Sequence, residues 1–193
     1  MVRPREFDEQ QALSSALQVF WEKGFEATSI SDLTDRMGIQ RPSLYAAFGD
    51  KRELFKAALL KYSQLSYSYV QNKLRSKETA REAIRSYFQG IVEGSKGTNT
   101  DLGCFCVNTM VELAPHDQAL AQITREYQIN LSMLLQQTLE SGIRSGELSI
   151  NLNAAAVARA LTVSAIGLSV TMKSPPDRSF ANQAVEEILS LLD

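Results

Sequence analysis

The chain has 193 residues, and its 20 Lys and Arg nearly balance 22 Asp and Glu, which gives a formal net charge of −2. A chain of this length can bury a sizeable core in one large or two small domains. The near-neutral charge argues against a protein that coats nucleic acid. The two cysteines, Cys104 and Cys106, are too few for a disulfide framework. The N-terminus lacks an apolar segment long enough for a secretion signal, so we expect a cytoplasmic protein.

The first predicted helix begins at Asp8, which suits an N-cap position after the apolar Phe7, and ends at Gly24. Apolar residues recur within this segment at helical spacing, and we expect them to pack in a core. These residues are Leu13, Ala16, Leu17, Phe20 and Trp21.

The second predicted helix begins at Ser29, which together with Asp32 resembles a capping box. Gly38 is typical of the left-handed residue that ends a helix. Between these ends, three residues keep helical spacing and give the helix one apolar face: Ile30, Leu33 and Met37.

A third, short helix follows almost at once. Pro42 suits its first position, where the missing N–H costs nothing. Pro42 also disfavours helical geometry for the preceding residue, so we expect Arg41 at the cap position. Leu44 and Phe48 form the inward face, the outward face is small and polar, and Gly49 ends the helix. Two short helices joined by a few residues around a glycine predict a helix-turn-helix.

The rest of the chain is predicted to be helical as well. A long fourth helix begins after Asp50, and we expect Leu54, Phe55, Ala58, Tyr62 and Leu65 on one of its faces. Further helices are expected near residues 79–95, 104–114, 117–145, 153–172 and 179–192. A Gly-, Thr- and Asn-rich segment at residues 96–101 predicts a loop.

These elements predict an all-α fold of about nine helices, because no segment shows the alternation of a strand. We expect two domains, residues 1–52 and residues 53–193. The apolar run at residues 154–172 is interrupted by Arg159 and Ser164, which disfavours membrane insertion. We therefore expect a helix packed among others and no membrane partner.

The N-terminal segment is similar to the DNA-binding domain of TetR/AcrR-type bacterial transcriptional regulators over residues 8–55. The residues that match in order and spacing are Gly24, Phe25, Thr28, Gly38, Ile39, Ser43, Leu44, Tyr45, Phe48 and Lys51. The resemblance implies an N-terminal three-helix, helix-turn-helix DNA-binding domain. It also implies a C-terminal helical domain for ligand binding and dimerisation.

By this resemblance, the helix at residues 42–48 enters the major groove of DNA. Arg41 could read guanine through its O6 and N7 atoms, and Gln40 or Ser43 could contact base edges or phosphates. Tyr45 matches a tyrosine that holds a backbone phosphate, and Lys51 matches a phosphate contact at a helix start. The full set of expected DNA-binding residues is Thr28, Ser29, Gln40, Arg41, Pro42, Ser43, Tyr45 and Lys51.

Two features depart from the family pattern. Ala46 and Ala47 stand where larger aromatic or imidazole side chains are common, and an alanine can only pack against a thymine methyl group. Residues 1–52 also carry seven basic and eight acidic side chains, whereas a DNA-binding module usually has a basic excess.

The resemblance further implies a homodimer, because one short helix reads only a few base pairs and two-fold dimers bind palindromic operators. We expect the dimer to form through the helices near residues 153–172 and 179–192. The C-terminal domains of this family bind a small-molecule effector, which the sequence does not identify. The predicted function is therefore a ligand-responsive DNA-binding transcriptional regulator, most often a repressor.

The sensor candidates are Cys104, Cys106 and Lys173. Cys104 stands at a predicted helix start, a setting that can lower the pKa of a thiol and make it reactive. Cys104 and Lys173 also resemble an electrophile-sensing branch of the family, in which a cysteine works alongside a lysine. In the alternative, both cysteines are small buried hydrophobes. A different hypothesis is a helical thiol or redox protein that uses Cys104 and Cys106.

Enzyme activity is not expected. His116 is the only histidine, and it cannot form a closed tetrahedral zinc site with the two cysteines unless carboxylates are added, so we expect no metal. A Ser-His-Asp or Cys-His catalytic set would have to use His116, and no suitable partners are near it in the sequence. Neither a phosphate-binding glycine loop nor a dinucleotide fingerprint occurs, and we predict no cofactor.

Overall fold

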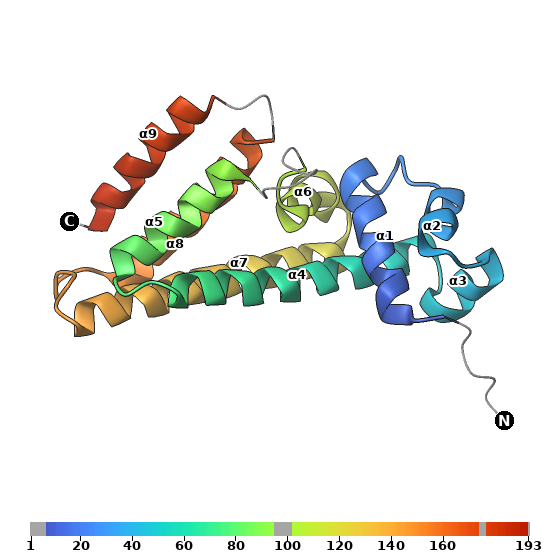
Figure 1. Cartoon of the computed structure of the whole chain (residues 1–193), viewed down its shortest axis with the longest axis horizontal. Coiled ribbons are helices and arrows are strands. Elements are labelled where there is room, and N and C mark those ends of the chain that lie inside the picture. Colours follow the sequence, from blue (N-terminus) through green and yellow to red (C-terminus); the bar gives the residue numbers. More distant parts are fainter. Residues whose placement is uncertain (1–6, 95–101, 174–176, 193) are drawn as a thin grey trace. The chain divides into compact units, whose positions relative to one another are not determined.

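The computed structural model describes residues 7–94, 102–173 and 177–192. Within these ranges the chain is all-α, with nine α-helices, two short 3-10 helices and no strand. The chain divides into two compact units, Met1–Ser63 and Gln64–Asp193 (Figure 1). The predicted loop at residues 96–101 lies outside the described residues.

The N-terminal unit contains α1 (Glu9–Lys23), α2 (Ile30–Met37), α3 (Arg41–Phe48) and the first half of α4 (Lys51–Arg75). The Asp8 carboxylate caps α1 by accepting hydrogen bonds from the backbone amides of Gln10 and Gln11. The core of the unit is aromatic, because the Phe55 ring meets Phe20 edge-on at 5.0 Å and Phe25 at 5.2 Å. This core fixes α1 against the start of α4.

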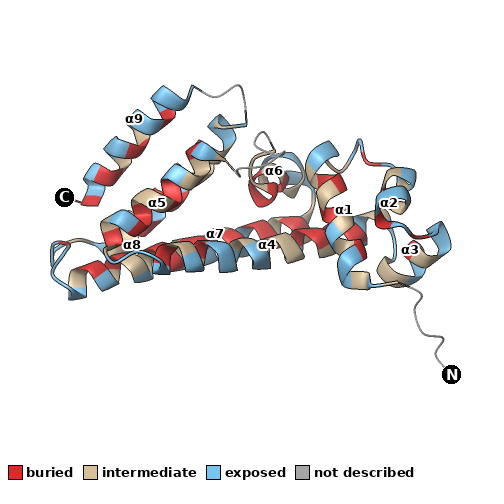
Figure 2. Cartoon of the chain, viewed as in Figure 1, coloured by how far each residue is buried: buried red, intermediate tan, exposed pale blue. Residues whose placement is uncertain are grey.

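The C-terminal unit contains the second half of α4, α5 (Ala80–Glu93), α6 (Phe105–Glu112), α7 (Gln118–Arg144), α8 (Ala154–Thr171) and α9 (Arg178–Leu189). The two 3-10 helices are η1 (Ala114–His116) and η2 (Ser190–Leu192). Helix α7 packs along α8, and α5 packs on α7, α8 and α9. Figure 2 shows the buried positions recurring along these helices. Fully buried members of this core include Ile84, Phe88, Leu135, Leu139 and Leu161.

Two sequence expectations about the helices need correction. The sequence predicts Leu65 on the same face of α4 as Leu54, Phe55 and Ala58. Those three residues are buried, whereas Leu65 is 57% exposed. The helix expected at residues 104–114 is shorter, since α6 ends at Glu112 and the chain continues as η1, where Pro115 interrupts the α-helical hydrogen bonds. Helix α8 is long and apolar enough to cross a membrane, and 33% of it is buried within the single chain, which leaves apolar surface for the contact expected with a second copy.

Candidate DNA-binding surface and thiol site

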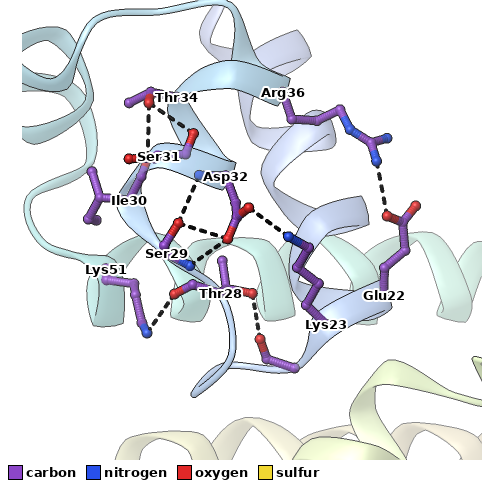
Figure 3. Close-up of polar contacts among 11 residues, drawn as sticks. Glu22, Lys23, Thr28, Ser29, Ile30, Ser31, Asp32, Thr34, Arg36 and Lys51 are labelled. Atoms are coloured by element: carbon purple, nitrogen blue, oxygen red, sulfur yellow. Dashed lines mark hydrogen bonds and ion pairs between the residues drawn. The ribbon is translucent and has the colours of Figure 1, made fainter.

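The start of α2 is built on the predicted capping box. The Ser29 hydroxyl accepts a hydrogen bond from the Asp32 amide at 3.0 Å, and the Asp32 carboxylate accepts one from the Ser29 amide at 2.9 Å. Lys23, the last residue of α1, donates to the same carboxylate at 2.6 Å (Figure 3). The Lys23 hydrogen bond, followed by those from Ser29, holds the pKa of Asp32 well below its usual range. These contacts attach the start of α2 to the end of α1.

The turn between α2 and α3 depends on Gly38. Its backbone lies in the left-handed region, with φ of 68° and ψ of 30°, where a side chain is disfavoured. The next residue, Ile39, is buried, and its amide donates to the Thr34 carbonyl at 3.2 Å. The chain therefore reverses tightly, and α3 begins two residues after Ile39.

Helix α3 is anchored by one fully buried side chain, Leu44. Its cap differs from the expectation, since Gln40 takes the extended N-cap conformation and Arg41 is the first helical residue. The restriction that Pro42 places on its predecessor is a bias, and at the first turn its missing N–H breaks no intrahelical bond. The outward positions are exposed at Gln40, Arg41, Pro42, Tyr45 and Ala46, and half-buried at Ser43 and Ala47.

Arg41 has its guanidinium on the exposed side of the turn. Its Nη2 donates to the Ser31 hydroxyl at 2.7 Å, and no carboxylate pairs with it among the described residues. An open concavity lies between α2 and the start of α3. Its lining residues are Ser31, Thr34, Asp35, Gly38, Ile39, Gln40, Arg41 and Pro42. A guanidinium without a carboxylate partner at the edge of this concavity is suited to bind a base edge or a phosphate.

Thr28 and Lys51 are linked to each other. The Lys51 ammonium donates to the Thr28 carbonyl at 2.9 Å (Figure 3). The same ammonium lies 4.4 Å from the centre of the Phe25 ring. The Thr28 side chain is buried, and its hydroxyl donates to the Gly24 carbonyl at 2.6 Å. Thr28 therefore holds the chain between α1 and α2, and its hydroxyl is not presented at the surface. Ser29 is exposed beside it.

Ion pairs account for part of the acidic excess in this unit. Glu22 pairs with Arg36 at 3.0 Å, and Asp32 pairs with Lys23 (Figure 3). Because their charges are locally compensated, these two carboxylates oppose DNA less than the count of charges suggests. Arg41 has no such pair, so the balance of charge on α3 is more basic than that of the whole unit.

The thiol candidates lie in the C-terminal unit and differ in access. Cys104 is the N-cap residue of α6 and is half-buried, and its thiol donates to the Tyr127 hydroxyl across 3.4 Å. Cys106 is fully buried. Burial, with Cys104 and Tyr69 nearby, raises the pKa of Tyr87 far above its ordinary value, so Tyr87 stays protonated beside the thiol.

Lys173 lies two residues beyond the end of α8, next to the segment that carries the thiol. A Cβ atom placed on Gly103 would lie 3.8 Å from the Lys173 Cβ. The Lys173 ammonium, however, pairs with Glu112 of α6 at 3.4 Å. The structure therefore brings Lys173 close to the Cys104 segment but gives its charge a carboxylate partner. No group of three His, Cys, Asp or Glu side chains that could hold a metal occurs within the described ranges.

Two contact residues of these sites were not anticipated from the sequence. Ser31 receives the hydrogen bond of Arg41, and Tyr127 receives that of Cys104, which lies 23 positions away in the chain. Ser31 fits the helix pattern as an ordinary exposed residue, and Tyr127 fits it as an ordinary core residue. Neither carries a local signal of its role.

Comparison with known proteins decides the family. Residues 12–58 match the family model for bacterial regulatory proteins of the tetR family. Residues 80–188, more than half of the chain, match the model for a tetracyclin repressor-like C-terminal domain. The protein belongs to the TetR family. It is accordingly a DNA-binding transcriptional regulator rather than an enzyme, and members of this family act as dimers with small-molecule effectors.

Relatives of this TetR-family chain match most or all of its length. The uncharacterized HTH-type transcriptional regulator YezE of Bacillus subtilis is 33% identical, with 100% of both chains covered. The HTH-type transcriptional repressor ComR of Escherichia coli is 31% identical over 89% of this chain and 82% of its own. A cysteine-substituted CifR, solved with 26-bp double-strand operator DNA, is 30% identical, covers 99% and 100% of the two chains, and has a TM-score of 0.85.

Proposed function

We propose that this TetR-family protein is a cytoplasmic repressor that binds a palindromic operator as a homodimer and leaves it when an effector binds. The observation that carries the proposal is the exposed face of α3. Leu44 alone is buried in this helix, while the side chains of Gln40, Arg41 and Tyr45 face outward. The relative ComR is named a repressor, which supports repression. The relative CifR was solved with operator DNA, which supports operator binding.

The chemistry of the exposed face suits a major groove. Arg41 can donate two hydrogen bonds to the O6 and N7 atoms of guanine by exchanging its contact with Ser31. Tyr45 is 49% exposed and can donate its hydroxyl to a backbone phosphate. The methyl group of Ala46 can pack against a thymine methyl group. Gln40 and Ser43 then serve neighbouring base edges or phosphates.

Phosphate binding extends to two other helix starts. The first backbone amides of α2 follow Ser29, and those of α4 follow Asp50. Helix N-termini favour phosphate because their free amides and the helix dipole attract negative charge. Lys51, the first residue of α4, adds a positive charge there. Thr28 contributes indirectly, by holding Lys51 through its carbonyl oxygen.

The homodimer forms, in this proposal, through α8 and α9. Large apolar side chains on these helices and on η2 are exposed in the single chain, which favours burial against a second copy. They are Val163, which is 70% exposed, Phe180, which is 62% exposed, and also Val170 and Leu191. Two copies of α3 related by a two-fold axis then read two half-sites of a palindrome.

The proposed effector is an electrophile that reacts with Cys104. Its thiol is half-buried at the start of α6, with the Tyr127 hydroxyl at 3.4 Å, whereas Cys106 is fully enclosed. The thiolate sulfur would form a bond to an electrophilic carbon, the thiol proton would pass to solvent, and the displaced electrons would leave on the electrophile's own leaving group or oxygen. An effector changes operator affinity only if it binds the two states of the protein differently.

The family assignment favours this regulator over a helical thiol or redox protein that uses Cys104 and Cys106. Salt-dependent DNA binding separates the two functions, because neutralised phosphates release counterions and the affinity of a regulator falls steeply with ionic strength. A thiol protein of the other class would ignore DNA and turn over a substrate.

The experiment is selection of bound sequences from random duplex DNA by the dimer, with Arg41→Ala and Tyr45→Ala in parallel. We expect the parent to enrich a palindrome, Arg41→Ala to lose base preference, and Tyr45→Ala to bind the same palindrome more weakly. Arg125→Ala is the matched control, because it removes an exposed arginine from α7 of the other unit. No enrichment by a folded parent dimer at low salt would overturn the proposal.

A further inference from the structure

The C-terminal unit contains a cavity of about 390 Å³ at the end of α4. Three segments line it. They are residues 71–79 at the end of α4 and in the following turn, residues 80–83 at the start of α5, and residues 134–147 at the end of α7 and just after it. The lining includes Gln71, Arg75, Lys77, Gln137, Ser141 and Arg144. Cys104, Tyr127 and Lys173 are not among the lining residues, so this cavity is separate from the thiol site.

Part of the cavity lining is apolar. Leu74, Ala83 and Leu134 line it and are each buried in the structure. The volume lies within the range of small-molecule sites, which span roughly 300–1,000 Å³, while polar side chains make up more of this lining than in most such sites. An apolar part of a small molecule can therefore rest on the apolar part of the lining.

The rim of the cavity is positively charged. Arg75, Lys77 and Arg144 are exposed, and none of them forms an ion pair with a described carboxylate. One of the two lining carboxylates, Glu147, is already engaged, because its two oxygens accept the Ala80 amide at 2.7 Å and the Arg81 amide at 2.8 Å. Both carboxylates keep their negative charge, so the three cations leave a formal excess of one positive charge on the lining. An excess of positive charge on a concave surface favours ligands of the opposite charge.

Two hydrogen-bonding side chains on the wall also have no partner among the described residues. They are Gln137 and Ser141, which stand one turn apart on α7 and both line the cavity. The other wall hydroxyls are used within the protein, since Thr138 donates to the Leu134 carbonyl and Ser145 donates to the Gly142 carbonyl. The free amide and hydroxyl are placed to hydrogen-bond a ligand oxygen.

We infer that this cavity binds a small organic anion that has an apolar body and a carboxylate group. The apolar body lies on Leu74, Ala83 and Leu134, and the carboxylate faces Arg75 and Arg144, where charge-assisted hydrogen bonds are strong. This site goes beyond the proposed operator and thiol chemistry, and it requires neither of them.

The test uses the isotope-labelled full-length dimer and two pairs of probes, benzoate with benzamide and hexanoate with hexanamide. Each amide has the shape of its carboxylate but no charge. We expect at least one carboxylate to shift the backbone amide signals of residues 75–80 and 137–147 in a saturable manner, at least fivefold more tightly than its amide. The double variant Arg75→Gln, Arg144→Gln should weaken that binding at least fivefold, whereas Arg125→Gln on the same helix should not.

The outcomes that overturn the inference are distinct. Absence of saturable shifts with both carboxylates would exclude the site, and equal binding of carboxylate and amide would exclude the anion. Unchanged binding by the double variant would show that Arg75 and Arg144 do not bind the carboxylate. Far-UV circular dichroism and thermal unfolding of each variant establish that it is folded, and the single variants Arg75→Gln and Arg144→Gln replace the double variant if it is not.

Discussion

Lys51 and Thr28, which are 23 residues apart, form a hydrogen bond in which the Lys51 ammonium donates to the Thr28 carbonyl at 2.9 Å. The same ammonium lies over the Phe25 ring, and that ring packs edge-on against Phe55 of α4. One cation thereby connects the start of α4 to the chain between α1 and α2. A residue expected only as a phosphate contact is also part of the framework that positions the helix-turn-helix.

The first prediction concerns this cation. Lys51→Met keeps a long apolar stem but removes the charged donor, so we expect the free energy of unfolding of the N-terminal unit to fall by about 2 kcal/mol. The chain has a single tryptophan, Trp21, which packs against Tyr62 in the same unit. Urea unfolding followed by tryptophan fluorescence therefore reports on this unit.

Lys56→Met is the matched control for Lys51→Met. Within the part of the chain that the structure describes, its ammonium forms only an i,i+3 pair with Glu53 at 3.6 Å, and such exposed pairs contribute little. An equal loss of stability in both variants would show that the contact with Thr28 does not stabilise the unit.

The second prediction is a pH dependence at Asp32. Its folded pKa is depressed by Lys23 and Ser29 below the ordinary aspartate value of about 3.9. The stabilisation is therefore present above that value and is lost as the pH falls through and below it. Asp32→Asn should be less stable than the parent at pH 7, and the difference should stay nearly constant down to about pH 5, begin to shrink near pH 4 and shrink further at pH 3 and below.

Urea midpoints from tryptophan fluorescence at pH 7, 5, 4 and 3 measure this effect. Asp35→Asn on the same helix is the control, because Asp35 takes part in no hydrogen bond of the capping box and its side chain is exposed. A constant difference between Asp32→Asn and the parent across this range would contradict the assigned role of the carboxylate.

The third prediction separates the two cysteines. Iodoacetamide should label Cys104 in the native protein and spare Cys106, which is fully buried, whereas both should react in concentrated urea. Tandem mass spectrometry of the peptide that contains both residues measures each rate. Equal native rates at the two thiols would contradict the difference in access.

The same chemistry tests the proposed effector response. N-ethylmaleimide should weaken operator binding by the parent and by Cys106→Ser but leave Cys104→Ser unaffected, as measured by fluorescence anisotropy of the selected operator. Labelling of Cys104 that proceeds no faster than that of a free thiol and leaves operator affinity unchanged would remove the sensor role.

The fourth prediction concerns packing in the C-terminal unit. A Cβ atom on Gly142 of α7 would lie 2.7 Å from the Ala80 Cβ and 2.9 Å from the Leu148 Cδ1. Gly142→Ala should therefore lower stability by about 1–3 kcal/mol in spite of the higher helix propensity of alanine. Thermal unfolding by circular dichroism measures the change. Ser141→Ala, at the neighbouring exposed position, should leave the midpoint nearly unchanged. An equally unchanged midpoint for Gly142→Ala would contradict the prediction, because it would mean that Ala80 and Leu148 can move away from residue 142 at little cost.

The elements of the helix-turn-helix could be predicted from the sequence because their signals are short-range. Asp32 lies three residues from Ser29, and the capping box forms as expected. Gly38 takes the left-handed conformation that ends α2, and Pro42 lies in the first turn of α3. Each of these signals depends on neighbours within one helical turn, so the pattern of residues contains the information.

The contacts between elements could not be predicted in the same way. The bond from Arg41 to Ser31 spans ten residues, and the one from Cys104 to Tyr127 spans 23. Which side chains contact each other depends on how the helices pack. Helical periodicity predicts which face of a helix is buried, but not which residues of another helix that face contacts. The exposure of Leu65 illustrates the limit, because it keeps the spacing of the core residues of α4 but lies beyond the packing that buries them.

Glu147 has a consequence for the order in which the C-terminal unit folds. Its carboxylate accepts the first amides of α5, from a position 67 residues later than Ala80. During synthesis, α5 leaves the ribosome long before this carboxylate exists, and its N-terminus has only the Thr79 hydroxyl as a cap. The start of α5 therefore becomes fully capped only after α7 and the turn that follows it have formed, which makes the completion of this unit a late, non-local step.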